Sequence, residues 1–316
     1  MPNSSLPQQV TIREVGPREG FQILPKAYPV EQKLKLIEAL ARASVGQIET
    51  TSFVRPDRVP QMADAEELVA RLPASPGVEF TALYLNQKGF ERAEQSGKLR
   101  NRGWLYTSPS SSFLKANSNT TIDESVAAVR EWAALFRKHG KGVSGLMVSN
   151  AFGCAFEGKV TASAVASLVE RFAAACEAAG ERIGEVCLAD TVGMGSPKSV
   201  RECVAAVRAL GFTVSLHLHD TMGLGLANVY AGLLEGVSVF ETSVGGMGGC
   251  PFTPGAAGNV ATEDVVYLCH EMGIKTNINL DRLCEAAQLA EFILGTPLPG
   301  RVYRARSSLS APKATD

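Results

Sequence analysis

The chain has 316 residues, of which 45% are hydrophobic and 20% are charged, and its formal net charge is -1. This balance of charge argues against nucleic acid or an anionic membrane as the main partner. The first residues lack both an apolar run and a basic amphipathic run, and no apolar run approaches the length of a membrane span. Seven cysteines, an odd number without a repeated spacing, do not make a disulfide framework. We therefore expect a cytoplasmic protein.

Short apolar runs alternate with helical patterns along the chain. Eight runs predict strands, at residues 10–15, 47–53, 78–85, 103–107, 145–149, 185–189, 213–216 and 237–243. Helical spacing of apolar residues predicts helices at 30–43, 63–72, 89–95, 162–178, 197–210, 226–234, 263–272 and 280–294, and one more that begins near Ile122 after a Ser-rich loop.

Eight strand–helix units in a row predict an α/β fold, a (β/α)8 TIM barrel with extra C-terminal helices. The strands are apolar on both faces, as parallel strands covered by helices are. No Gly-rich dinucleotide-binding motif follows a strand, which weakens the doubly wound alternative. We expect one catalytic barrel over residues 10–298, a disordered segment at 1–9 and a flexible tail at 299–316.

Two histidines follow the seventh predicted strand. His217 and His219 are two residues apart, so on an extended chain their side chains share a face and lie roughly 6–7 Å from each other. The C-terminal ends of barrel strands carry the active sites of such folds. Two imidazoles directed at one point are typical of a metal site. Paired histidines on a strand can also be plain hydrogen-bonding residues.

Polar residues follow the other predicted strands as well. They are Arg18, Glu19, Glu49, Ser52, Ser149, Asn150, Asp190 and Thr191, with Cys250 and Asn259 after the last strand. In a barrel they share one mouth, and a carboxylate, two imidazoles and an amide oxygen suit Mg²⁺ or Mn²⁺ and tolerate Zn²⁺ or Co²⁺.

Several of these residues also have an ordinary explanation. Glu19 beside Arg18 can equally be a member of an ordinary surface ion pair. Asn259 stands where a residue capping the next helix would be. Cys250 reads as a small buried apolar residue, but four of its five preceding residues are glycines, which leaves it little core to be buried in.

In these residues the chain resembles the hydroxymethylglutaryl-CoA lyase family of the DRE-TIM metallolyase group. The resemblance covers about residues 11–272. It rests on eight motifs in order, VGPREG at 15–20, IETTSFV at 48–54, VPQM at 59–62, GC and EG at 153–154 and 157–158, ADTVG at 189–193, HLHDT at 217–221, GMGGCP at 246–251 and GNVATED at 258–264.

The resemblance implies a divalent metal and a retro-Claisen cleavage of hydroxymethylglutaryl-CoA to acetyl-CoA and acetoacetate. The implied metal ligands are Glu19, His217, His219 and Asn259. The implied catalytic residues are Arg18, which neutralises enolate charge, Glu49 and Asp190, which position groups or assist proton transfer, and Cys250, which lies on a mobile loop.

The resemblance also implies an acyl-CoA partner and suggests a homodimer. Residues 113–119 are a candidate CoA contact, with Lys115 available for a phosphate. We expect the substrate or CoA to contact Gln22, Ser52, Lys115, Asn117, Ser149, Asn150 and Thr191.

The first motif departs from the family's pattern. The family usually has Arg-Asp-Gly-Leu-Gln-Asn-Glu where this chain has REGFQIL at 18–24. Glu19 adds a methylene group at the metal, which puts metal affinity and preference in question. Phe21, Ile23 and Leu24 predict a more apolar mouth and therefore a different acyl group.

Three alternatives stay open. One alternative is the same chemistry on another 3-hydroxy acyl-CoA, such as citramalyl-CoA or a longer-branched glutaryl-CoA. A Claisen-type synthase for isopropylmalate or homocitrate shares the first motif and the histidine pair. We expect such a synthase, however, to carry a long C-terminal regulatory domain. The cysteine loop also favours the lyase. A non-catalytic barrel that binds CoA or metal should have lost several ligands independently, yet all are present.

Overall fold

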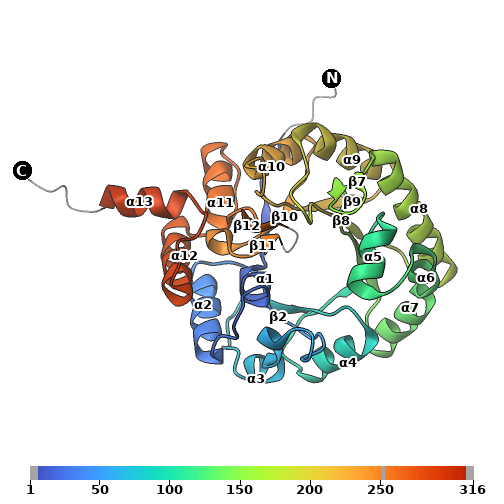
Figure 1. Cartoon of the computed structure of the whole chain (residues 1–316), viewed down its shortest axis with the longest axis horizontal. Helices are drawn as coiled ribbons and strands as arrows, with labels where there is room; N and C mark the ends of the chain where they lie inside the picture. Colours follow the sequence, from blue (N-terminus) through green and yellow to red (C-terminus); the bar gives the residue numbers. More distant parts are fainter. Residues whose placement is uncertain (1–5, 251–252, 311–316) are drawn as a thin grey trace, which may run out of the picture.

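The computed structural model describes residues 6–250 and 253–310, with the backbone alone at 250, 253–257 and 310. Eight parallel strands curl into a ring in the order β3-β2-β1-β10-β9-β8-β5-β4 (Figure 1). Their bounds are β1 Thr11–Glu14, β2 Gln47–Ser52, β3 Glu79–Leu83, β4 Gly103–Thr107, β5 Val143–Val148, β8 Glu185–Ala189, β9 Thr213–His217 and β10 Val239–Thr242. The predicted (β/α)8 barrel is confirmed.

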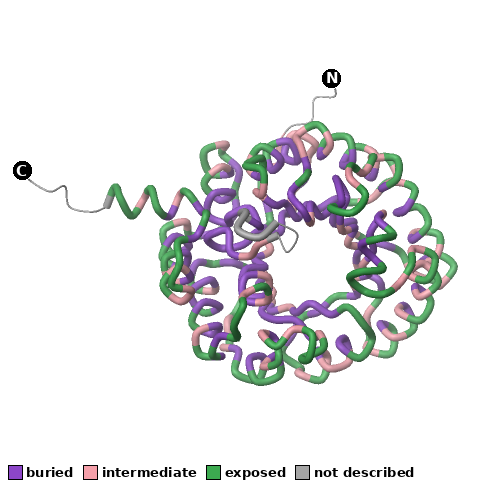
Figure 2. Tube along the Cα trace, viewed as in Figure 1, coloured by how far each residue is buried: buried purple, intermediate pink, exposed green. Residues whose placement is uncertain are grey.

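Helices surround the strands and bury their outer face. The long ones are α2 Val30–Arg42, α4 Gln87–Gln95, α7 Val129–Lys138, α8 Ala162–Ala178, α9 Pro197–Ala209, α10 Gly225–Leu234, α11 Thr262–Glu271 and α12 Leu280–Leu294; α3 spans Ala65–Ala70. Buried residues follow the strands and the inner helix faces, whereas the outer helix faces are exposed (Figure 2). This is the pattern that the apolar periodicity predicts.

The ring closes between β3 and β4. The backbone amide of Arg100 donates to the carbonyl of Phe80 at 2.7 Å, and the backbone amide of Ala82 donates to Oδ1 of Asn101 at 2.9 Å. A buried asparagine therefore supplies part of the hydrogen bonding that a regular strand pair would give.

At three places the structure has helices where the sequence suggested loops or one longer helix. The first motif forms α1 (Gly16–Gln22), with a proline in its first turn. The Ser-rich segment contains α5 (Ser111–Ser118), capped by the side chain of Ser110, which accepts from the amide of Phe113. The helix expected from Ile122 is divided into α6 (Ile122–Ala127) and α7.

Two short hairpins and two single turns complete the framework. The hairpins pair β6 (Gly153–Cys154) with β7 (Gly158–Lys159), and β11 (Gly249–Cys250) with β12 (Thr253–Ala257). Single turns of 3₁₀ helix lie at Pro60–Met62 and Val244–Gly246. In the part of the chain that the structure describes, no helix has both the length and the apolar character to span a membrane.

Both ends of the described chain carry more structure than the sequence predicted. At the N-terminal end, Gln9 bridges Lys275 and Leu6 packs against the core, so residues 6–9 are held. At the C-terminal end, α13 (Val302–Ser310) replaces part of the expected flexible tail. Its first turn is capped by Asp264, which accepts from the amide of Val302 at 2.7 Å, and Tyr303 is buried. These tertiary contacts have no local sequence signal.

Candidate metal centre and catalytic cavity

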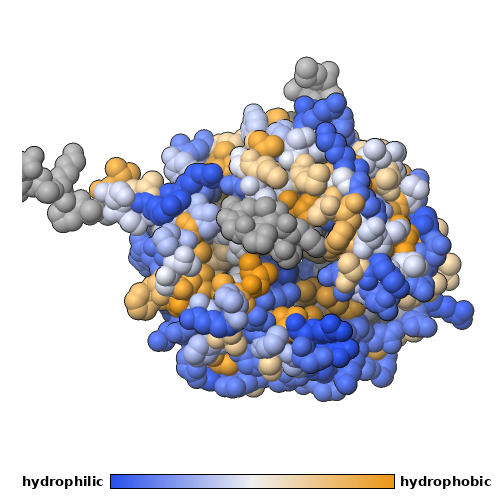
Figure 3. All heavy atoms as spheres, viewed as in Figure 1, coloured by the Kyte–Doolittle hydropathy of each residue, from blue (hydrophilic) through white to orange (hydrophobic). Residues whose placement is uncertain are grey.

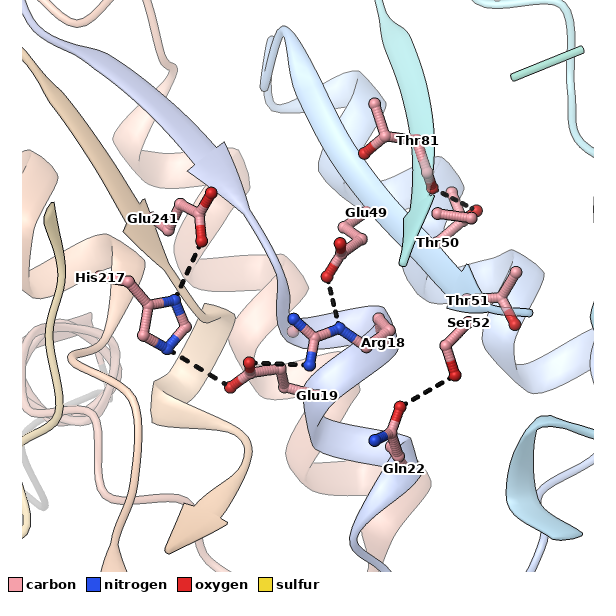
Figure 4. Close-up of polar contacts among 12 residues, drawn as sticks. Arg18, Glu19, Gln22, Glu49, Thr50, Thr51, Ser52, Thr81, His217 and Glu241 are labelled. Carbon is pink, nitrogen blue, oxygen red and sulfur yellow. Dashed lines mark hydrogen bonds and ion pairs between the residues drawn. The ribbon is translucent and has the colours of Figure 1, made fainter. Parts of the chain in front are cut away.

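The two histidines meet at the end of β9. His217 is the last residue of the strand, and His219 continues the extended chain and forms an antiparallel bridge with Asn259. Both are buried, and their Nε2 atoms are 3.2 Å apart. Oε2 of Glu19, from α1, lies 3.7 Å from Nε2 of His217 and 4.0 Å from Nε2 of His219. The predicted convergence of these three residues is present, and Figure 4 shows Glu19 and His217 directed toward each other.

The spacing of these atoms fits a cation. Two ligand atoms bound at about 2.1 Å with an angle near 100° are roughly 3.2 Å apart, which is the separation of the two nitrogens. Burial and the neighbouring His217 lower the pKa of His219 to about 4, so its imidazole is neutral at pH 7. Burial raises the pKa of Glu19, but Arg18 and His217 outweigh it and hold the pKa well below its ordinary value, so Glu19 is a carboxylate. The neutral imidazole of His219 and the carboxylate of Glu19 are therefore in the forms that bind metals. For His217 the effect of burial is outweighed by the neighbouring carboxylates, which raise its pKa.

Asn259 lies beside these three residues. Its Nδ2 donates to Oε2 of Glu19 at 2.6 Å and to the carbonyl of Met247 at 3.2 Å. Its Oδ1 is buried, and no described group hydrogen-bonds to it. The helix that follows is capped at Ala261, so Asn259 is not the cap of α11. A buried amide oxygen without a partner is costly, and a cation held by the neighbouring ligands would satisfy it.

Arg18 lies between two acids in the barrel mouth. Its Nη1 is 2.8 Å from Oε1 of Glu19, and its Nε donates to Oε2 of Glu49 from β2 (Figure 4). Burial raises the pKa of Glu49 to about 7, although the charge of Arg18 opposes this. Glu49 is therefore a group that can hold or release a proton near neutral pH. Arg18 keeps its charge, which makes it a fixed positive centre beside the metal ligands.

An open cavity of about 240 Å³ reaches these residues. Its lining residues are Arg18, Glu19, Gln22, Ile23, Leu83, Leu85, Tyr106, Phe113, Asn117, Met147, Ser149, Ala189, Thr191, His217, His219 and Gly249. Figure 3 shows the surface hollowed near the middle of this face, with hydrophobic residues at the edge of the hollow. Four of the predicted substrate contacts, Gln22, Asn117, Ser149 and Thr191, line this cavity.

Other predicted contacts lie behind its wall or outside it. Ser52 is fully buried and donates through Oγ to Oε1 of Gln22 at 2.9 Å, so it orients a wall residue. Asn150 is also buried and has a left-handed backbone conformation with φ 58°. Its backbone N–H donates to Oγ1 of Thr191. Lys115 is exposed on α5.

Asp190 is fully buried at the end of β8. Its carboxylate accepts from the backbone amide of Gly195 at 3.0 Å and so holds the loop that leads into α9. Burial raises its pKa to about 6. A part for Asp190 in proton transfer stays a prediction.

The apolar residues of the first motif do not all face the mouth. Phe21 is buried and packs against Tyr28, with ring centroids 5.4 Å apart, and Leu24 packs against the core. Only Ile23 of the three lines the cavity. Helical geometry explains the difference, because α1 turns about 100° per residue and sends Phe21 and Gln22 in different directions.

Cys250 ends β11, and its side chain lies outside the described residues. Its catalytic role therefore stays a prediction. The six other cysteines are buried and free, as predicted; they are Cys154, Cys176, Cys187, Cys203, Cys269 and Cys284.

One acid of the site was missed by the sequence analysis. Glu241 on β10 lies with Oε2 3.0 Å from Nδ1 of His217. Its signal in the sequence is that it is the lone carboxylate in the predicted strand at 237–243.

Comparisons with known proteins agree with this geometry. Residues 9–290 match the family model described as HMGL-like. The chain belongs to the HMGL-like family. It is 40% identical to the mitochondrial hydroxymethylglutaryl-CoA lyase of Bos taurus, over 89% of this chain and 85% of that protein. The crystal structure of hydroxymethylglutaryl-CoA lyase from Pseudomonas aeruginosa superposes with a TM-score of 0.89 at 36% identity and covers 96% of this chain and 99% of that one.

A second similar structure holds ligands. An HMG-CoA lyase from Acinetobacter baumannii in complex with coenzyme A and 3-methylmalate superposes with a TM-score of 0.84 at 34% identity, over 98% of this chain and 97% of that one. The chain is thus similar to solved lyase structures along nearly its whole length.

Proposed function

We propose that this chain is a metal-dependent carbon–carbon lyase that cleaves 3-hydroxy-3-methylglutaryl-CoA to acetyl-CoA and acetoacetate. The observation that carries the proposal is the convergence of Glu19, His217 and His219 at an open cavity beside the fixed charge of Arg18. The relatives named as hydroxymethylglutaryl-CoA lyases support the choice of reaction.

Four residues would hold the divalent cation, Glu19, His217, His219 and Asn259. The mixed oxygen and nitrogen set favours Mg²⁺ or Mn²⁺ and tolerates Zn²⁺ or Co²⁺. A cation held there would supply Lewis-acid chemistry, which would make the C3 hydroxyl of the substrate easier to deprotonate.

The remaining steps fall to the side chains. When the C3 hydroxyl loses its proton, the C2–C3 bond breaks, C3 becomes the ketone of acetoacetate, and the electron pair of the bond passes to the thioester enolate. Arg18 stabilises that enolate because its charge is permanent and already in place. Glu49, bonded to Arg18 and with a pKa raised to about 7 by burial, is placed to fix the guanidinium and to take a proton. Cys250 would return a proton to C2 and complete acetyl-CoA.

In the bound substrate, the CoA moiety would extend out of the cavity along α5. Asn117 lines the cavity from this helix, and exposed Lys115 lies two residues earlier, available for a phosphate. We further propose a cytoplasmic homodimer, which cell fractionation and light scattering of the purified protein would test.

A cleavage assay tests the proposed reaction. Hydroxymethylglutaryl-CoA and citramalyl-CoA are each supplied with Mg²⁺ or Mn²⁺ and a reducing agent, and the released acetyl-CoA and keto acid are measured. We expect acetoacetate from the first substrate, and none after chelation or in His217→Ala. Pyruvate from citramalyl-CoA alone would keep the chemistry and overturn the substrate. Absence of both products from a metal-loaded enzyme would overturn the proposal.

A second candidate substrate is favoured by a side chamber of about 230 Å³. This chamber lies beneath α5, shares Leu85, Tyr106 and Phe113 with the catalytic cavity, and is lined deeper in by Leu105 and Phe172. Thr107, Glu124 and Ser125 also line the chamber, so its wall is partly polar. The apolar part beside Phe113 would accept a 3-hydroxyglutaryl-CoA with a longer branch at C3.

Narrowing the chamber tests this second candidate. Ala128 lines it, whereas Ala127 is exposed. We expect Ala128→Phe to lower kcat/KM for a longer-branched substrate about tenfold relative to hydroxymethylglutaryl-CoA, and Ala127→Phe to leave the ratio unchanged. An equal ratio in both variants would contradict the candidate.

A further inference from the structure

Three strands place a row of polar side chains across the barrel. Arg13 of β1 is in register with Glu241 of β10, and Glu241 is in register with His217 of β9. Residues paired across neighbouring strands project to the same face of a sheet. Arg13 and Glu241 both line a cavity inside the barrel, and Glu241 and His217 are buried. The strand register therefore brings a carboxylate directly behind one of the two histidines.

The contact between Glu241 and His217 fixes a proton. A carboxylate can only accept, so Nδ1 of His217, 3.0 Å from Oε2 of Glu241, carries the hydrogen. In the neutral ring this leaves the lone pair on Nε2, the atom that faces Nε2 of His219 at 3.2 Å and Oε2 of Glu19 at 3.7 Å. The second histidine differs, because no described group hydrogen-bonds to the buried Nδ1 of His219.

Glu241 is not simply the counter-ion of Arg13. The two terminal nitrogens of Arg13 bind both carboxylate oxygens of Glu185, at 2.6 and 2.8 Å, and its Nε donates to Gln47 at 3.0 Å. These three hydrogen bonds of Arg13 all go to residues other than Glu241. The carboxylate of Glu241 contacts His217 instead. Arg13 still adds positive charge behind the carboxylate.

We propose that Glu241 is a positioning residue, which holds His217 as the Nδ1–H tautomer with its Nε2 lone pair directed at the cation site shared with His219 and Glu19. This inference rests on the proposed metal-dependent function. It predicts unequal histidines: a carboxylate outside the cation site sets the tautomer and ring orientation of His217, whereas Nδ1 of His219 has no described partner of this kind. Partners of this kind typically change metal affinity 10- to 100-fold.

Metal affinity and the histidine tautomer are measured on the whole chain without substrate. Mn²⁺ is titrated into the parent protein and into Glu241→Gln, Glu241→Asp and Glu241→Ala by calorimetry. ¹⁵N NMR of the metal-free proteins reports which ring nitrogen of His217 carries the proton. The matched control is Glu185→Gln, because Glu185 is also a carboxylate inside the barrel but bonds to Arg13 and Ser215. Thermal unfolding shows that each variant is folded.

We expect Glu241→Gln and Glu241→Ala to bind Mn²⁺ at least tenfold more weakly and to give a mixed His217 tautomer. Glu241→Asp should recover part of the affinity, and Glu185→Gln should match the parent. Unchanged affinity and tautomer in folded Glu241→Gln and Glu241→Ala would overturn the inference, as would an equal loss in Glu185→Gln. A parent that binds no metal would overturn the proposed function instead, and the tautomer of metal-free His217 would still decide the role of Glu241.

Discussion

The two walls of the catalytic cavity differ in kind. The wall built by α1, β9 and the loop after β10 carries Arg18, Glu19, His217, His219 and Asn259, which are bound to one another through charges and hydrogen bonds. The facing wall, from β3, β4, β5 and α5, contributes Leu83, Tyr106, Phe113 and Met147. The first wall carries the charged and polar groups that the proposed cleavage requires. The second wall carries side chains that define the shape of the cavity. Catalysis and choice of acyl group should therefore respond to different mutations.

The largest effect is expected from the fixed charge of the first wall. Arg18→Gln removes the group that stabilises the leaving enolate, so kcat/KM should fall about 1000-fold. The matched control is Arg55→Gln, because Arg55 is exposed and its ion pair with Asp57 lies on the surface. Steady-state cleavage of hydroxymethylglutaryl-CoA measures both. A loss below tenfold in Arg18→Gln would remove Arg18 from the mechanism.

The cysteine loop should give the next largest effect. If Cys250 returns a proton to the enolate, Cys250→Ala should lower kcat about 100-fold, a typical value for a general acid. Cys284→Ala, in a buried position on α12, is the control for loss of a thiol. A Cys250→Ala enzyme with the parent kcat would show that another group supplies the proton.

The length of the acidic metal ligand is the next test of the first wall. Glu19→Gln removes the negative charge and should weaken Mn²⁺ binding about 100-fold, since hard cations require carboxylates. Glu19→Asp keeps the charge and restores the family's usual residue, so it should retain or raise activity. Calorimetry and the cleavage assay measure the pair. Loss of activity in Glu19→Asp with unchanged metal content would count against Glu19 as a ligand.

Mutations in the second wall should change substrate specificity and leave metal binding unchanged. Phe113 separates the catalytic cavity from the side chamber, because it lines both. Phe113→Ala should therefore raise kcat/KM for a longer-branched acyl-CoA about tenfold relative to hydroxymethylglutaryl-CoA. Phe292→Ala, at a side chain that is 83% exposed, is the control. An unchanged ratio in Phe113→Ala would mean that this wall does not select the acyl group.

The stability of the region behind the first wall should depend on pH. Burial raises the pKa of Glu263 to about 8. Its folded pKa lies above its unfolded pKa, so its contribution to stability is complete below about pH 4.5 and is lost as pH rises through about 8. The free energy of unfolding should fall between pH 5 and 9 by roughly 3 kcal/mol more in the parent than in Glu263→Gln. Parallel pH profiles from urea unfolding would contradict this.

The sequence predicted the barrel because apolar periodicity is a local property that the barrel strands and most of the surrounding helices display. It also predicted the meeting of His217 and His219, since residues two apart on an extended chain share a face. It missed α5, because a Ser-rich segment resembles a loop until Ser110 is seen to cap it. The contact of Glu241 with His217 depends on the register between two strands, which no local pattern carries.

Orientation within short helices was the other source of error. Phe21 was expected in the mouth, but α1 turns it into the core against Tyr28. The error concerns where a side chain points, which packing decides after the backbone is fixed.

Parallel measurement of one variant from each wall tests the separation of chemistry from acyl selection most directly. Mn²⁺ affinity and kcat/KM for two acyl-CoA substrates are determined for His217→Ala and Phe113→Ala. We predict that His217→Ala loses metal and loses both activities in proportion, whereas Phe113→Ala binds metal like the parent and changes the ratio of the activities. A changed ratio in His217→Ala, or weakened metal binding in Phe113→Ala, would contradict the account.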